Sequence, residues 1–91
     1  MDKLLKIFKA LSDKNRVRIM SMLTKKELCV CEITHVLKLA TSTVSKHLAV
    51  LKNVGLVEAE KRGLNVYYRL KCPCIMNIFS CIETVNKPKE E

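Results

Sequence analysis

The sequence predicts a mainly α-helical fold with a small β-hairpin, in the order α-α-α-α-β-β-α. Apolar residues recur at helical spacing in several segments. Two of these segments lie within residues 32–53, on either side of a short turn at 38–40. Residues 56–70 then alternate like two strands around a basic turn. A helix, a turn, a second helix and a two-stranded ribbon form a winged helix-turn-helix, with 32–53 as the helix-turn-helix and 56–70 as the wing.

The N-terminal part of the chain predicts two helices. The first is expected over residues 1–11, where apolar residues cover a wide stripe. Ser12-Asp13 is then expected to start the second helix, with Ser12 as its N-cap and Asp13 as an acid at the positive end of its dipole. Arg16 and Arg18 are expected to point outward from it.

The third helix is predicted to begin near Cys31, after the run Glu27-Leu28-Cys29-Val30. Cys29 and Glu32 have the spacing of a capping box, in which a hydroxyl residue normally takes the first position. A thiol is a poor cap, and loss of a good cap costs roughly 1 kcal/mol. A sequence that gives up this cap has some use for the sulfur, so the position favours a functional cysteine.

The fourth helix, from Thr41 as N-cap to Lys52, is the predicted DNA reader. Val44, Leu48 and Leu51 form one apolar stripe at i, i+4 and i+7. The other side carries short donors and a cation near the helix start, as the major groove requires. The predicted DNA-contacting residues of this helix are Ser42, Thr43, Ser45, Lys46 and His47.

The predicted wing has strands at 56–60 and 65–70, with the turn at 61–64. Lys61 and Arg62 in that turn, together with Arg69 on the second strand, are expected to contact DNA phosphates. A last helix is predicted over residues 73–85, which have a clean apolar stripe, and residues 86–91 form a charged tail that should fray.

The whole chain, residues 1–91, is expected to be a single domain. A core this small is marginal, so a homodimer is predicted, with helices 1–11 and 73–85 as its interface. Seventeen basic against nine acidic residues give a net charge of +8, which favours double-stranded DNA as partner. No signal peptide or membrane span is recognised, so the protein is expected in the cytoplasm. The sequence has no catalytic triad or phosphate-binding glycine loop, which argues against an enzyme.

Five cysteines in a chain of this length predict thiol chemistry in a reducing compartment. Soft thiolates favour As(III), Sb(III), Cd(II), Pb(II) or Cu(I) over magnesium or calcium. In a regular helix, however, Cys29 and Cys31 diverge by about 200°. They can hold one ion together only if the first turn is not helical, since residues two apart share a side in an extended segment.

The segments FKALSDKNRVRIMSML, ELCVCEI, STVSKHLAVLKNVGLV and KRGLNVYYRL, in this order, closely resemble the ArsR/SmtB family of winged-helix repressors. The resemblance covers residues 8–70. It implies a homodimer that binds an operator near its own promoter and that a metal ion or metalloid releases. ELCVCEI further resembles the arsenic-, cadmium- and lead-sensing branch, which implies Cys29 and Cys31 as thiolate ligands.

One position departs from that resemblance. Arsenite sensors of the best-known type have a third cysteine where this chain has Thr34. A third ligand would then come from Cys72, Cys74 or Cys81, in the same or the other subunit. The inducer is expected to be As(III), Sb(III) or a soft divalent ion such as cadmium or lead, with zinc as a further candidate, and no organic cofactor is expected.

Capture of the ion is predicted to distort the start of the third helix and so to move the DNA reader. Two alternatives remain open. The cysteines could instead form a disulfide or polysulfide, making a redox or persulfide sensor of the same fold. The chain could also be a basic winged-helix protein that binds nucleic acid without any inducer.

Overall fold

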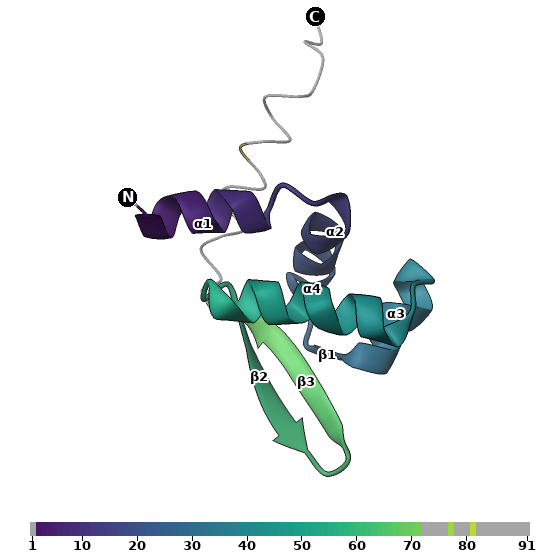
Figure 1. Ribbon diagram of the computed structural model, residues 1–91. Helices are drawn as coiled ribbons and strands as arrows, with labels where there is room; N and C mark the ends of the chain where they lie inside the picture. The colour runs from purple at the N-terminus through teal and green to yellow at the C-terminus, as the bar shows by residue number, and fades with distance from the viewer. Residues whose placement is uncertain (1, 72–76, 78–80, 82–91) are drawn as a thin grey trace, which may run out of the picture.

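The computed structural model describes residues 2–71, 77 and 81, and its described part is a winged helix-turn-helix (Figure 1). The elements are α1 (Asp2–Ala10), α2 (Lys14–Leu23), β1 (Leu28–Cys29), α3 (Val30–Leu37), α4 (Thr41–Asn53), β2 (Val57–Arg62) and β3 (Asn65–Leu70). The predicted fold class is confirmed in these residues. The predicted last helix, 73–85, and the tail, 86–91, lie outside the described residues except for Asn77 and Cys81.

The core lies where α2, α3 and α4 meet the sheet. The stripe Val44, Leu48 and Leu51 of α4 is fully buried, as predicted. Its partners in the same cluster are Ala10, Ile19, Met20, Leu23, Leu28, Ile33, Leu37, Leu56 and Val57. In Figure 1, α4 crosses the middle of the molecule and the ribbon of β2 and β3 extends away from the helices. Within the described residues, no helix has the length and apolar character needed to cross a membrane.

Two helix ends follow from local sequence. The N-cap of α2 is Asp13 and not the expected Ser12, because the Ser12 hydroxyl donates back to the carbonyl oxygen of Lys9. The carboxylate of Asp13 accepts from the backbone N–H groups of Asn15 and Arg16 at 2.8 and 3.2 Å. Lys38 ends α3 in the left-handed conformation, with φ 56°. This residue turns the chain sharply, so that α4 begins only a few residues later.

The predicted N-cap of α4 is wrong by one residue. Thr41 is already helical, and the N-cap is Ala40, whose methyl side chain offers no hydrogen bond to the first turn. The hydroxyl of Thr41 suggested a cap, but the left-handed Lys38 fixes where the chain re-enters a helical path. The helix α4 therefore begins without a side-chain cap on its first backbone N–H groups.

The sheet has a third strand that the sequence analysis did not predict. β1 pairs antiparallel with β3, with Leu28 opposite Tyr68 and Cys29 opposite Tyr67, so the strand order is β1-β3-β2. A strand of two residues shows no alternation of polar and apolar side chains. Only its partner on β3 defines it, and that partner lies about 40 residues further along the chain.

The wing turn is shorter than predicted. β2 continues through Lys61 and Arg62, so the loop consists of Gly63 and Leu64 alone. Gly63 has φ 63°, which suits the first position of a type II′ hairpin turn. Lys61 and Arg62 therefore lie on a strand, paired with Val66 and Asn65, and Leu64 forms the exposed tip.

Candidate DNA-binding surface and cysteine pair

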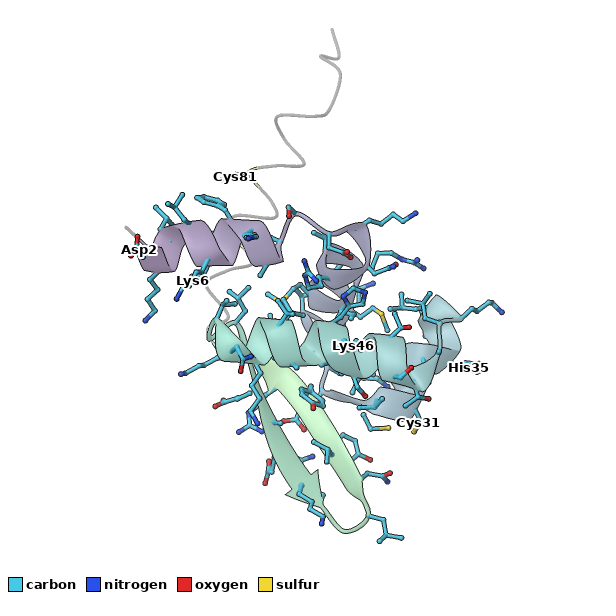
Figure 2. The ribbon with its side chains drawn as sticks, viewed as in Figure 1. Asp2, Lys6, Cys31, His35, Lys46 and Cys81 are labelled. Carbon is cyan, nitrogen blue, oxygen red and sulfur yellow. The ribbon has the colours of Figure 1, made fainter. Side chains whose placement is uncertain are left out.

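The outer face of α4 carries most of the predicted DNA-contacting residues. Ser42, Ser45 and Lys46 are exposed, and Thr43 is half-buried. Figure 2 labels Lys46 midway along α4, on the helix that the core stripe anchors from the other side. The helix therefore presents hydroxyls and one cation from its first turns, where side chains of a recognition helix reach base edges.

His47 lies differently from the other predicted contacts, because it faces the rest of the protein. Its side chain is 14% exposed, with Nδ1 3.3 Å from Nη1 of Arg16 and Nε2 3.9 Å from Oδ1 of Asp13. Arg16 also donates from Nε to the carbonyl oxygen of Ala10, so it does not point outward as expected. His47 thus joins α4 to the start of α2 and the end of α1.

The wing presents its cations unequally. Lys61 is exposed. Arg62, in contrast, is held by carboxylates, with Nη1 2.8 Å from Oε1 of Glu27 and Nη2 2.8 Å from Oε1 of Glu60. Its guanidinium also stacks over the ring of Tyr67, 5.1 Å from the centroid. Of the three predicted phosphate contacts in the wing, Lys61, Arg62 and Arg69, only Lys61 is without an ion pair among the described residues.

Arg69 completes an ionic network around Arg62. It donates to Glu58 at 3.1 Å and to Glu60 at 3.0 Å, and lies 3.7 Å from Glu27. The hydrogen bonds from Arg62 and then Arg69 lower the pKa of Glu60. The hydrogen bonds to Glu60 are the main cause of the raised pKa of both Arg62 and Arg69. Three carboxylates thus face two guanidinium groups, and this side of the wing is not a basic surface.

The two predicted ligand cysteines lie side by side. Their Sγ atoms are 2.9 Å apart, and both residues are free thiols. Cys29 is the N-cap of α3, with extended backbone at φ −92° and ψ 166°, whereas Cys31 lies in the first helical turn. The predicted obstacle of helical divergence is therefore absent, because the first of the pair stands outside the helix. Cys29 is buried and Cys31 is exposed.

The capping box predicted from Cys29 and Glu32 is present. The carboxylate of Glu32 accepts from the backbone N–H of Cys29 at 2.9 Å, and the backbone of Glu32 faces the Cys29 sulfur in return. The hydrogen bond from Cys29 lowers the pKa of Glu32. The neighbouring thiol of Cys31, followed by burial, raises the pKa of Cys29. The sulfur thus occupies the capping position without a side-chain cap hydrogen bond and remains in contact with the second thiol.

An open hollow of about 410 Å³ borders Cys31, the exposed member of the pair. It is lined by Lys26, Leu28, Cys31, Glu32, His35 and Val36. Figure 2 labels Cys31 and His35 at the end of the molecule that α3 forms. In the described part of the chain, no three side chains of His, Cys, Asp or Glu form a metal-binding group. Of the predicted third ligands, Cys81 is exposed, and Cys72 and Cys74 lie outside the described residues.

Sequence reasoning missed Glu27 and Arg16. Glu27 gave no periodic signal, because it follows two lysines in a short connection and finds its partners on β2 and β3. Arg16 lies on the polar face of α2, which the sequence pattern predicts to face solvent, but it contacts the end of α1 and His47 of α4. Both residues act through contacts with distant parts of the chain, so no local pattern could have identified them.

Known proteins resemble this chain both in sequence and in fold. The model of the family "Bacterial regulatory protein, arsR family" matches residues 13–59. A cadmium resistance transcriptional regulatory protein CadC homolog of Staphylococcus aureus is 47% identical over 66 residues, covering 71% of this chain and 54% of the relative. The arsenic resistance transcriptional regulator ArsR1 of Pseudomonas putida is 43% identical over 65 residues, covering 70% and 51%. The chain therefore spans about half the length of these curated relatives.

Among solved structures, a homodimeric winged helix-turn-helix DNA-binding domain from Mycobacterium bovis superimposes with a TM-score of 0.84 at 31% identity. That match covers 92% of this chain and 78% of the other. These relatives are named as regulators or DNA-binding domains, not as enzymes. The family match includes α2, the helix-turn-helix and the start of the wing, together with both cysteines of the pair. The chain therefore belongs to the arsR family of bacterial regulatory proteins.

Proposed function

We propose that this chain is a metal-responsive repressor that binds operator DNA as a homodimer and is released by a soft ion held at Cys29 and Cys31. One observation carries the proposal: two thiols lie in contact at the start of α3, the helix that packs against the DNA-reading helix α4. The relatives named for cadmium and arsenic resistance support an ion of this class. A regulator that acts on the chromosome belongs in the cytoplasm, which is the compartment we propose.

DNA binding is assigned to α4 and the wing. Ser42, Thr43 and Ser45 are positioned to reach bases, and Lys46 and Lys61 to reach phosphates. His47 contributes through its contact with Arg16, and we propose that it orients α4 rather than touching DNA. Arg62 reaches phosphate only if it leaves Glu27 and Glu60.

The dimer interface is proposed to include α1. Leu4, Leu5 and Phe8 are 47%, 62% and 56% exposed, although all three are large and apolar. A second subunit would remove them from water. The Mycobacterium bovis domain with the same fold is named as a homodimer. A two-fold dimer places its recognition helices in successive major grooves about 34 Å apart.

The inducer is proposed to be As(III), Sb(III) or a soft divalent ion such as cadmium or lead. Two adjacent thiols are the donor set that such ions prefer. A third thiolate from Cys72, Cys74 or Cys81 would complete a trigonal site. Cys29 must lose its proton on binding, so its hydrogen bond with Cys31 and its place in the capping box are both disturbed. A change at this end of α3 reaches α4 through the buried contacts of Ile33 and Leu37.

The test is release of operator DNA, titrated in parallel with arsenite, antimonite, cadmium, lead and zinc. The variant with Cys29→Ser and Cys31→Ser should bind the operator like the wild type and should not be released. Single serine variants of Cys72, Cys74 and Cys81 then identify the third ligand by a weaker response. Release of the double variant by the same ions would refute the cysteine assignment, and equal affinity for random and operator DNA would favour a binder without inducer.

A persulfide or oxidant signal is the second candidate, and the sulfur–sulfur contact of 2.9 Å favours it. In that reaction the two thiols lose two protons and two electrons to the oxidant and form a disulfide. Adding persulfide and hydrogen peroxide to the same titration separates the candidates. Release by these reagents without release by any ion, together with loss of two hydrogen atoms in the mass of the chain, would select this reading.

A further inference from the structure

We propose that Glu27 couples the cysteine pair to the wing, so that occupation of the sulfurs reaches the DNA surface through the sheet as well as through α3. This inference rests on the proposed function and adds a second route within it. Glu27 is a positioning residue here, because it touches neither the sulfurs nor the predicted DNA contacts of α4.

The first step of the route is backbone pairing. Cys29 belongs to β1, and its partner across the sheet is Tyr67 of β3. The same Tyr67 lies beneath the guanidinium of Arg62. The buried cysteine of the pair is thus one strand away from the residue on which a wing cation rests. Movement of Cys29 is therefore transmitted to β3, the central strand of the sheet.

The second step is the carboxylate of Glu27, two residues before Cys29. Its two oxygens contact different arginines, with Oε1 2.8 Å from Arg62 and Oε2 3.7 Å from Arg69. These arginines come from β2 and β3, so Glu27 ties the connection before β1 to both strands of the wing. An isolated surface ion pair is worth little, but geometry is better defined where several charges form a network.

Capture of an ion must move this assembly. With bonds as long as zinc–sulfur bonds, about 2.3 Å, two sulfurs on one ion lie about 3.8 Å apart at a tetrahedral angle and about 4.0 Å at a trigonal angle, both wider than the present 2.9 Å contact. Cys31 is fixed within α3, whereas Cys29 lies on a strand of only two residues. The shorter element is the easier one to displace. Displacement of β1 changes the position of Glu27, and with it the hold on Arg62 and the orientation of the wing.

The experiment compares Glu27→Gln with the matched control Glu58→Gln. Each variant removes one carboxylate from the same network, but Glu58 belongs to β2 and has no link to β1. Operator affinity is measured by fluorescence anisotropy with and without cadmium chloride, and cadmium uptake by the ultraviolet charge-transfer band of the thiolates. We expect both variants to bind cadmium and operator. In Glu27→Gln the cadmium-induced loss of affinity should be smaller than in the wild type by about three-fold or more, and in Glu58→Gln it should be unchanged.

A second readout needs no DNA. Hydrogen exchange at the amides of residues 65–70 should change when cadmium is added to the wild type and should change less in Glu27→Gln. The coupling would be overturned if cadmium weakened operator binding as much in Glu27→Gln as in the wild type. It would also be overturned if cadmium left hydrogen exchange at residues 65–70 of the wild type unchanged. Failure of the proposed function looks different: the wild type would then take up no cadmium through Cys29 and Cys31, or would keep its operator when loaded.

Discussion

At the scale of single residues, the junction of Asp13, Arg16 and His47 determines how α4 sits on the other helices. Asp13 caps α2 and faces His47, His47 contacts Arg16, and Arg16 binds the last carbonyl of α1. The junction therefore joins the proposed dimer helix to the proposed reading helix through polar side chains. Its geometry depends on the ionised form of Asp13.

This dependence predicts how acid affects stability. Burial would raise the pKa of Asp13, but the backbone N–H groups of Arg16 and Asn15 and the neighbouring positive charges hold it below its ordinary value of 3.8. A carboxyl whose pKa is lowered in the folded state stabilises the fold above that ordinary value, and the contribution is lost as pH falls through the folded pKa. Asp13→Asn keeps a capping acceptor but cannot titrate.

In urea unfolding below about pH 4, the free energy of unfolding of the wild type should therefore decline more steeply than that of Asp13→Asn. Above that pH the two curves should run parallel, with the wild type the more stable. Parallel curves across the whole acid range would show that the charge of Asp13 contributes nothing to the fold.

At the scale of elements, what the sequence could predict depended on whether the signal was local. The stripe of α4 and the capping box of Cys29 with Glu32 involve residues within one or two turns of each other, and both are present. The N-cap of α2 was expected at Ser12 and lies one residue later, at Asp13. β1 was missed because two residues have no periodicity. The pairing of Arg62 with Glu27 was missed because it joins residues 35 positions apart.

The start of α4 allows a direct test at this scale. Ala40 occupies the N-cap without a side-chain acceptor. Ala40→Ser should supply one and raise the free energy of unfolding by about 1 kcal/mol. Thr41→Ala is the control, expected to change it by less than about 0.5 kcal/mol because Thr41 is not the cap. Urea unfolding measures both changes in the free energy of unfolding. A larger effect of Thr41→Ala than of Ala40→Ser would show that Thr41 is the N-cap.

At the scale of the whole molecule, we expect different residues to determine the stability of one subunit and the formation of the dimer. The core cluster lies within α2, α3, α4 and the sheet, while α1 contributes mainly Ala10 and leaves Leu5 and Phe8 exposed. Residues that are outside the core of one subunit can be changed without unfolding it. A charge placed on α1 should therefore act on the dimer.

Leu5→Lys should yield a folded monomer with operator affinity at least about ten-fold weaker, because one half-site alone remains in contact. Val36→Lys is a matched control: Val36 is 53% exposed, against 62% for Leu5, but lies on α3. Sedimentation velocity gives the oligomeric state and circular dichroism the fold. A Leu5→Lys protein that sediments as a dimer would remove α1 from the interface.

Net charge predicts a further property of the assembly. Phosphate contacts release counterions, so operator affinity should fall linearly on a plot of log affinity against log salt. Lys46→Ala should reduce the slope by about one for each subunit that binds. Lys6→Ala removes the same charge from α1, which is a different part of the surface in Figure 2, and should leave the slope unchanged. Equal slopes for the wild type and Lys46→Ala would exclude that lysine as a phosphate contact.

One side of α3 packs against the core, and the other side faces an open hollow. Ile33 and Leu37 are buried against the rest of the domain, whereas Cys31 and His35 border the open hollow. Donor atoms on the outer side can thus be exchanged while the packed side stays intact. If the proposed ion site is correct, a few substitutions on the outer side of α3 would change which ion it selects while the fold is preserved.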